Sequence, residues 1–337
     1  MNGRALVVGL VYDVFGSYPR RPGDPPDAEA EYEPEATVEA LEAALGRLGH
    51  RAVRLGNAHA LLAAASQGTP PPLDAALSIA EGYGTRNREA WAPVLLDMLG
   101  IPALGSDALT LSLALDKAWT KDVVSAAGVP APPQLSVEAA AELASAALPG
   151  PFPLFVKPRW EGTAKGIGAG SRVEDRAALG ERVAWLVERY RQPALVEPFL
   201  PGAEYTVTLV GNEPPDVLPL LQRALESRTG IGLHAVEASA PPGAALAHVA
   251  PGRLDAALEA ELGELARRAF RALRCRDFAR VDFKLDAAGR PWFLEINPLP
   301  TFSPEGSFGI LAELAGRPLA DLLADVLRRG LARVRPG

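Results

Sequence analysis

The chain has 337 residues, of which 48% are hydrophobic and 22% are charged. This length fits two or three packed subdomains, and the composition excludes a disordered chain. The net charge is −7 and no block of Lys or Arg stands out, which excludes nucleic acid and an anionic membrane surface as main partners. Because no apolar run reaches the roughly twenty residues of a membrane span, we expect a cytoplasmic protein.

The first hundred residues alternate short apolar runs with helical patterns, which predicts an α/β layer with a mostly parallel sheet. The expected strands and helices are Ala5–Val11, Thr37–Leu48, Ala52–Leu55, Ala75–Ile79 and Glu89–Leu99. After the first strand, the segment Ser17–Glu35 is rich in Pro, Gly and acidic residues. It is either a disordered loop or, because it leaves the carboxyl end of a strand, a lid over a substrate.

The rest of the chain predicts two α+β units after a boundary near residues 105–130. Elements expected in the first unit are a helix or helix pair over Asp107–Ala127, a strand over Phe152–Lys157, a glycine-dense loop over Gly162–Ser171, a helix over Arg176–Arg191 and a strand over Ala194–Phe199. The second unit begins at Glu204, is interrupted by the polar stretch Gln222–Gly243, and closes with a helix over Pro318–Arg333.

Rare residue types limit the chemistry. Cys275 is the single cysteine, which excludes an intrachain disulfide and a multi-Cys zinc site. Its apolar surroundings favour a small buried residue over a nucleophile. The four histidines show no metal-binding spacing. Any metal is therefore expected to have oxygen ligands.

Two alternating runs, Arg280–Leu285 and Trp292–Asn297, flank a turn signal and predict a β-hairpin. The expected cross-strand pairs are Val281/Ile296, Phe283/Leu294 and Leu285/Trp292 on an apolar face, with Asp282/Glu295 and Arg280/Asn297 on the other face. Facing carboxylates repel each other, so we expect a cation between Asp282 and Glu295. With Asn297 they form an oxygen donor set suited to Mg²⁺, and a solvated face with ordinary surface charges is the alternative.

Four glycines, at positions 162, 166, 168 and 170, follow the predicted strand that ends at Lys157. Backbone amides of such a loop can approach phosphates closely. Taken alone, the loop is better interpreted as a flexible turn, because it matches neither the Walker nor the Rossmann pattern. Lys117 and Lys157 are two of only five lysines, and their proximity to the loop favours phosphate contact.

Five motifs follow one another along the chain: Lys157-Pro158, Glu161-Gly162-Thr163, Val196–Glu204, Arg280-Val281-Asp282 and Leu294–Asn297. In their order and spacing they resemble the motifs of the D-alanine–D-alanine ligases of the ATP-grasp superfamily, and the resemblance extends from about Ile79 to the C-terminus. The resemblance implies an ATP-grasp fold, mixed α/β and α+β, with an N-terminal Rossmann-like domain. It implies an N-terminal substrate domain over residues 1–106, a central ATP-binding domain over 107–195 and a C-terminal catalytic domain over 196–337.

The resemblance also implies the roles of individual residues. The residues that would contact ATP are Lys117, Lys157, Gly162, Thr163, Glu197, Phe199, Leu200 and Glu204. One or two Mg²⁺ ions, replaceable by Mn²⁺, would be held by Asp282, Glu295 and Asn297. Arg280 and Asn297 would be the catalytic residues. Arg280 would stabilise the oxyanion that forms when an amine attacks an acyl phosphate. Such chemistry requires positioning and charge neutralisation, and no protein nucleophile.

The substrate end departs from the family pattern. Asp13 lies in Gly9–Gly16, which replaces the usual Gly-Gly-x-Ser-x-Glu motif, and Glu81 stands where the family has the histidine of a His-Gly segment. Thr301 takes the place of a glycine. Arg86, Arg88 and Ser303 complete the set of residues expected to contact substrate.

A mobile loop of the family usually supplies a lysine, whereas Gln222–Gly243 contains none, so Arg223 or Arg228 is the expected substitute. We predict an ATP- and Mg²⁺-dependent carboxylate–amine ligase that acts on amino acids or small carboxylates other than D-alanine. Related ligases commonly dimerise, so a homodimer is expected. Two alternatives stay open: an authentic D-alanine–D-alanine ligase of cell-wall precursor synthesis, and an ATP-binding module without ligase activity.

Overall fold

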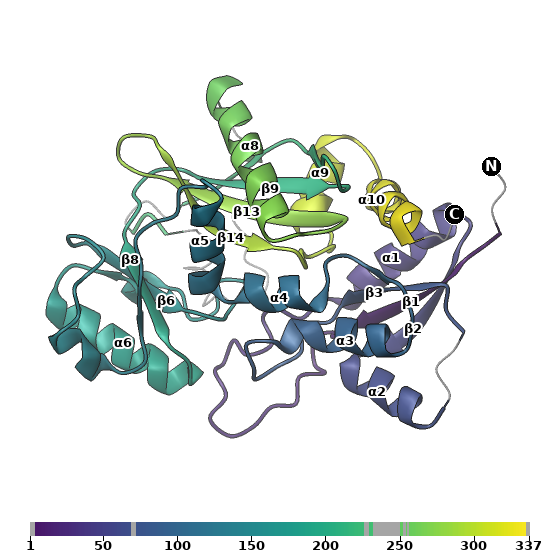
Figure 1. Ribbon diagram of the computed structural model, residues 1–337, viewed down its shortest axis with the longest axis horizontal. Coiled ribbons are helices and arrows are strands. Elements are labelled where there is room, and N and C mark those ends of the chain that lie inside the picture. The colour runs from purple at the N-terminus through teal and green to yellow at the C-terminus, as the bar shows by residue number, and fades with distance from the viewer. Residues whose placement is uncertain are drawn as a thin grey trace.

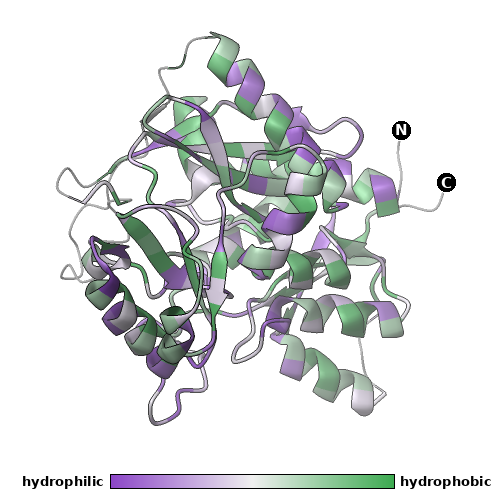
Figure 2. Ribbon diagram, turned by 60° about the vertical axis from the view of Figure 1, so that its left-hand side comes forward, coloured by the Kyte–Doolittle hydropathy of each residue, from purple (hydrophilic) through white to green (hydrophobic). Residues whose placement is uncertain are grey.

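The computed structural model describes residues 4–68, 72–225, 229–231, 250–251, 254 and 256–334. Three β-sheets lie beside one another, with helices between them and around them (Figure 1). The helices at the surface carry bands of hydrophilic and hydrophobic residues, as amphipathic helices do (Figure 2). Among the described residues, no helix is long and apolar enough to cross a membrane.

The first sheet is parallel, with strand order β2-β1-β3-β4. Its elements are β1 (Val7–Tyr12), α1 (Glu35–Arg47), β2 (Arg51–Gly56), α2 (Ala58–Ser66), β3 (Ala75–Ile79), the 3₁₀ turn η1 (Arg88–Ala90), α3 (Trp91–Met98) and β4 (Ala103–Leu104). Every residue of β3 is buried, as expected of a central parallel strand covered on both faces. The predicted α/β layer is confirmed, with α2 as an addition.

The C-terminal helix α10 (Leu319–Val334) returns to this first layer and packs on α1. Its buried residues recur at helical spacing and include Leu323, Val326, Leu327 and Leu331. Asp277, which is fully buried, accepts hydrogen bonds from the Gly105 amide (2.8 Å) and from Arg333 Nε (2.8 Å). The end of the chain therefore completes the core begun by its first strands.

The central sheet has strand order β5-β8-β6-β7, and its strands pair antiparallel. It comprises β5 (Leu135–Val137), the 3₁₀ turn η2 (Ala140–Ala144), β6 (Leu154–Pro158), the 3₁₀ turn η3 (Ala169–Ser171), β7 (Arg172–Val173), α6 (Arg176–Tyr190) and β8 (Ala194–Pro198). Helix α6 buries Leu179, Val183 and Leu186 against it. The predicted strand–loop–helix–strand unit is confirmed.

The third sheet has strand order β12-β11-β9-β13-β14, with β10 also paired to β9. Its elements are β9 (Glu204–Val210), β10 (Asp216–Val217), β11 (Leu221–Arg223), β12 (Ala250–Pro251), α8 (Ala256–Ala272), β13 (Phe278–Leu285), β14 (Pro291–Asn297) and, after the sheet, α9 (Ser307–Leu314). Leu262, Leu265 and Ala269 line the buried face of α8, which covers the sheet. The domain boundaries expected at residues 106 and 195 stay a prediction.

A helix pair joins the first layer to the other two. Helix α4 (Ala108–Leu115) and helix α5 (Lys117–Ala126) are separated by Asp116, whose carboxylate accepts hydrogen bonds from the Ala118 and Trp119 amides at 3.2 Å. Asp116 thereby caps α5 and sets its direction. Since Lys117 is the first residue of α5, this cap also fixes the position of the Lys117 backbone.

The hairpin β13–β14 forms, but only three of the five predicted cross-strand pairs are correct. The pairs Arg280/Asn297, Val281/Ile296 and Asp282/Glu295 are confirmed. Beyond Asp282 the register shifts, so that Phe283 pairs with Phe293 and Leu285 with Pro291, in place of Leu294 and Trp292. The cause is a β-bulge at Leu294, which inserts one extra residue into β14. Phe293 is thereby fully buried, whereas Leu294 lines the cleft described below.

Candidate active site

A cleft of about 460 Å³ lies between the central sheet and the third sheet. The expected site residues that line it are Lys117, Lys157, Thr163, Glu197, Phe199, Leu200, Glu204, Arg280, Asp282, Glu295 and Thr301. They come from α5, from the strands β6, β8, β9, β13 and β14, and from the adjoining loops. Segments that are distant in the sequence therefore supply one continuous surface.

One end of the cleft is apolar. Phe155 on β6 and Phe199 after β8 lie with ring centroids 6.4 Å apart, and Leu200, Ile167 and Ile231 complete the lining. Aromatic faces and aliphatic side chains of this kind accept a flat ring. The apolar end is therefore suited to a heteroaromatic base.

A buried Lys–Glu–Lys cluster lies beside the apolar end. Glu197 pairs with Lys157 Nζ at 2.9 Å and with Lys121 Nζ. Burial raises the pKa of Glu197, but the two lysines outweigh it and lower that pKa. Burial also lowers the pKa of Lys121 to about 7, against the opposing effect of Glu197. Sequence reasoning missed Lys121, although its position four residues after Lys117 places both on one face of α5.

The other end of the cleft, its charged end, carries side chains of both signs. Arg280 Nη2 lies 3.1 Å from Asp282 Oδ2 and 3.8 Å from Glu295 Oε1. Lys117 Nζ lies 3.1 Å from the other oxygen of Glu295, and Thr206 Oγ1 donates to Asp282 Oδ1 at 2.7 Å. Although burial raises the pKa of Glu295, the nearby cations, with Lys117 and Arg280 foremost, bring it to about 2. The expected cation between the two carboxylates is, in this structure, the Arg280 guanidinium.

The donor set fits a hard divalent ion in part. Asp282 and Glu295 offer carboxylate oxygens to the cleft, which are the ligands that Mg²⁺ prefers. Asn297 is directed differently, because its Oδ1 accepts a hydrogen bond from the Leu299 amide at 2.8 Å. Within the described ranges, no group of three His, Cys, Asp or Glu residues is arranged to hold a metal. Two carboxylates would need further oxygens, such as those of phosphates.

Glu204 lines the cleft and pairs with two cations. Lys284 Nζ lies 3.3 Å from its Oε2, and Arg223 Nε lies 3.7 Å from its Oε1. Lys284 was not expected at the site, although its alternation with Asp282 along β13 places both on one face. Arg223 lines the cleft, whereas Arg228 and most of Gln222–Gly243 lie outside the described residues.

The segment Ser17–Glu35 packs against the glycine loop, which contradicts the interpretation as a disordered loop. The Gly162 amide donates to Glu31 Oε1 at 2.5 Å, and the Gly166 amide donates to Asp27 Oδ2 at 3.0 Å. Gly162 itself is outside the cleft lining, but the next residue, Thr163, is part of it. The segment thus packs on the glycine loop and also reaches the cleft, because Ala30 is part of the cleft lining.

Most of the expected substrate residues lie outside the cleft lining. Asp13 is buried, accepts a hydrogen bond from the Gly82 amide at 2.9 Å, and has a pKa raised by burial. Arg86 stacks 4.4 Å from the Trp119 ring, and Arg88 is buried in ion pairs. Ser303 is also buried, and its amide donates to Thr301 Oγ1 at 3.2 Å. Thr301 alone among the set lines the cleft.

Two carboxyl groups near Arg88 are disfavoured as anions. Burial, together with the charges of Glu89 and Glu31, raises the pKa of Glu81 well above its usual value. Burial raises the pKa of Glu89 to about 7, and the neighbouring cation Arg88 offsets this only in part. Glu89 is 7% exposed. Both groups therefore favour the neutral form at the carboxyl end of the first sheet.

The Glu89→Gln variant is expected to be more stable than the wild type at pH 8 and equally stable near pH 4. An unfolded Glu ionises near pH 4.5, whereas Glu89 in the fold retains its proton up to about pH 7. The raised pKa of Glu89 therefore costs the wild type no stability below pH 4.5. As the pH rises through 7, it lowers the free energy of unfolding by up to about 3 kcal/mol. Thermal unfolding midpoints at both pH values measure it, with exposed Glu138→Gln as the control. A shift of equal size at both pH values contradicts the assignment.

Cys275 is buried as predicted, and burial raises the pKa of its thiol to about 12. A thiol with this pKa is almost entirely protonated near neutral pH, and the thiolate is the reactive form. The interpretation of Cys275 as a structural residue is therefore supported, and the cleft contains no thiol among its described lining residues.

Comparison with known proteins agrees with this arrangement. The sequence model of the D-ala D-ala ligase C-terminus matches residues 125–328. The chain is 35% identical over 249 residues to a D-alanine–D-alanine ligase of Pelotomaculum thermopropionicum, covering 72% of this chain and 76% of that protein. It is 31% identical over 299 residues to the uncharacterized protein y4sG of Sinorhizobium fredii, covering 86% of each.

Solved structures show the same fold. A D-alanine–D-alanine ligase from Bacillus anthracis complexed with ATP superposes with a TM-score of 0.69 at 19% identity, covering 98% of this chain and 99% of that one. The VanG D-Ala:D-Ser ligase from Enterococcus faecalis has a TM-score of 0.70 at 17% identity, covering 97% and 100%. The mixed α/β fold is that of the ATP-grasp ligases. From its matched residues, its relatives and its fold, the chain belongs to the D-alanine–D-alanine ligase family of ATP-grasp enzymes.

Proposed function

We propose that this ligase uses ATP and Mg²⁺ to activate a substrate carboxylate as an acyl phosphate and then joins it to an amine. The observation that carries the proposal is Arg280, whose side chain is 13% exposed and lies 3.1 Å from Asp282 at the charged end of a cleft whose other end is apolar. A nucleotide has the same polarity, with a flat base at one end and phosphates at the other. The charged end is therefore where phosphoryl and acyl transfer would occur.

The proposed reaction has two balanced steps. A substrate carboxylate oxygen attacks the γ-phosphorus of ATP, and ADP leaves with the electrons of the broken P–O bond. The amine nitrogen then attacks the acyl carbon, inorganic phosphate leaves, and the amine releases its proton. Arg280 stabilises the negative charge that develops on the acyl oxygen, while Lys117 and Lys157 neutralise phosphate oxygens. Bound Mg²⁺ would supply further neutralisation of the phosphates, held by Asp282 and Glu295.

The remaining lining residues support ATP binding. Phe199 and Leu200 border the apolar end, where the adenine would lie. The Glu204 carboxylate, paired with Lys284 at 3.3 Å, would accept hydrogen bonds from the ribose hydroxyls. Gly162 and Thr163 belong to the loop that would cover the phosphates, and because the Gly162 amide is bonded to Glu31, the Thr163 amide would be the donor to them. The proposed contribution of Asn297 is weakest, since its Oδ1 is bonded to the Leu299 amide.

The proposed substrates are amino acids or small carboxylates other than D-alanine. Three positions support this: Asp13 in the first layer is bonded to the Gly82 amide, Glu81 in the same layer replaces the family's histidine, and Thr301 after β14 replaces a glycine at the cleft. Thr301 changes the size of a position in the cleft lining, whereas Asp13 and Glu81 change the charge at the carboxyl end of the first sheet. A pocket built for D-alanine would have no need of these replacements.

The direct test incubates the pure protein with ATP, Mg²⁺ and a panel of amino acids, and measures ADP release and product mass. We expect an amide product from at least one pair that lacks D-alanine. Robust dipeptide from D-alanine alone means that the substrate part of the proposal is wrong. Hydroxylamine added to the same reactions traps an acyl phosphate, so hydroxamate without an amide product identifies an enzyme that stops at the first step.

A further inference from the structure

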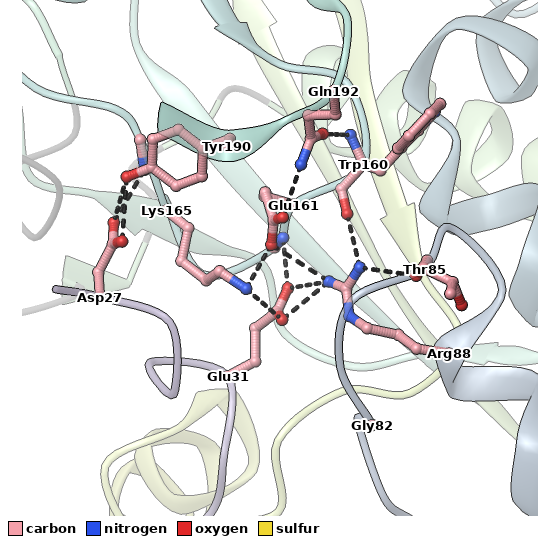
Figure 3. Close-up of polar contacts among 12 residues, drawn as sticks. Asp27, Glu31, Gly82, Thr85, Arg88, Trp160, Glu161, Lys165, Tyr190 and Gln192 are labelled. Atoms are coloured by element: carbon pink, nitrogen blue, oxygen red, sulfur yellow. Dashed lines mark hydrogen bonds and ion pairs between the residues drawn. The ribbon is translucent and has the colours of Figure 1, made fainter. Parts of the chain in front are cut away.

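Four buried charges connect the first layer to the glycine loop. Glu31, from the segment Ser17–Glu35, accepts from Arg88 Nη2 with both carboxylate oxygens at 2.8 Å (Figure 3). Lys165, within the glycine loop, lies 2.9 Å from Glu31 and also pairs with Glu161. Arg88 reaches Glu161 at 3.4 Å. Two acids and two bases thus form a closed, neutral set whose side chains are 4–12% exposed, and three of them, Arg88, Glu161 and Lys165, line a small pocket of about 130 Å³.

Glu31 is held firmly as an anion in this set. Burial raises its pKa, but Arg88 and Lys165 outweigh that effect and lower it overall. Removing the carboxylate would leave two buried cations with Glu161 as their remaining acid in the cluster. Buried charges without partners are costly, so the position of Glu31 is set by the surrounding structure and is not interchangeable with a surface glutamate.

The same segment binds the backbone of the glycine loop at two points. Glu31 Oε1 accepts from the Gly162 amide at 2.5 Å. Four residues further along the loop, Asp27 accepts from the Gly166 amide at 3.0 Å and from Tyr190 Oη at 2.8 Å. The two contacts bracket Thr163 and Ala164, which line the cleft.

The bracketed residues have an unusual backbone. Thr163 has φ +46° and Ala164 has φ +57°, in the left-handed region that non-glycine residues rarely adopt. Such conformations persist where the surroundings hold them, and they direct the backbone amides of the loop. The two anchors from the N-terminal segment are the contacts that flank this turn on either side.

We propose that Glu31 is a positioning residue for ATP, which acts by holding the loop 162–166 in the shape that presents the amides of Thr163 and Ala164 to the phosphates. Asp27 supports it at the second anchor. Glu31 itself is outside the cleft lining, whereas its neighbour Ala30 and the loop residues Thr163 and Ala164 are part of it. The inference rests on the proposed phosphate role of the loop, and it makes ATP affinity depend on a segment of the first layer.

The test compares Glu31→Gln and Asp27→Asn with Glu29→Gln, a matched control on the same segment whose carboxylate pairs with Arg20 at 2.9 Å, away from the loop. Calorimetry with Mg²⁺ and a non-hydrolysable ATP analogue measures affinity, and hydrogen exchange measures the amides of residues 162–167. We expect Glu31→Gln to weaken binding by at least about tenfold and to speed exchange over the loop. The control should stay within twofold on both measurements.

A folded Glu31→Gln variant with wild-type affinity and wild-type exchange overturns the proposal. A merely structural role would lower the unfolding temperature without changing affinity, which also counts against it. If Glu31→Gln does not fold, Asp27→Asn decides, because it leaves the four-charge cluster intact: faster exchange at Gly166 supports the anchoring, and unchanged exchange refutes it. Neither measurement requires a substrate pair. A panel without amide product would therefore contradict the proposed ligation and leave this inference standing.

Discussion

Replacing Arg280 with alanine is expected to lower kcat by about 10²- to 10³-fold, which is the usual effect of removing one group that stabilises a developing oxyanion. The affinity for ATP is expected to stay within about threefold, because Lys117, Lys157 and the apolar end of the cleft remain in place. Steady-state ADP release gives kcat, and calorimetry with a non-hydrolysable ATP analogue gives the affinity.

Arg280 also compensates the charges of Asp282 and Glu295, so Arg280→Lys is the necessary companion variant. It keeps the charge but loses the planar geometry, and we expect a kcat between those of the wild type and Arg280→Ala. Arg290→Ala, in the exposed turn of the same hairpin, is the matched control and should retain full activity. If ATP affinity falls as far as kcat, Arg280 acts in nucleotide binding and its proposed catalytic role is wrong.

Replacing Glu295 with alanine is expected to lower turnover by on the order of 10³-fold and to abolish its dependence on Mg²⁺ concentration. The physical reason is that Asp282 alone would leave the ion with a single carboxylate ligand in the cleft. Turnover measured across a Mg²⁺ titration checks this. Asp282→Ala is expected to behave in the same way, since the two carboxylates face each other across β13 and β14.

Glu295 also pairs with Lys117 at 3.1 Å, so the loss of that ion pair must be separated from loss of the metal. Glu295→Gln keeps the volume and one oxygen, and we expect it to show the same loss of Mg²⁺ dependence with a smaller change in unfolding temperature. Asp286→Asn in the hairpin turn serves as the control for removal of one negative charge. Unchanged turnover in Glu295→Ala would remove the metal assignment altogether.

Part of the hairpin was predictable and part was not. Alternation of apolar and polar residues has a period of two, so it placed Asp282, Glu295 and Arg280 on one face correctly. The bulge at Leu294 left no mark on that alternation, because Phe293 and Leu294 are both apolar and either one satisfies the pattern. Only the packing of Phe293 into the core, at zero exposure, decided which of the two turned inward.

The sequence by itself determined the order of elements, the family motifs and most of the polar residues at the charged end of the cleft, because local periodicity and short motifs encode them. It did not determine how the first layer contacts the glycine loop. Glu31 and Lys165 are more than a hundred residues apart, and no local pattern relates a loop acid to a distant base. Their ion pair depends on burial at a junction that exists only once the layers have packed. Tertiary structure therefore decided which of the many acidic residues of the chain are buried next to cations, and so which of the buried carboxylates are anionic.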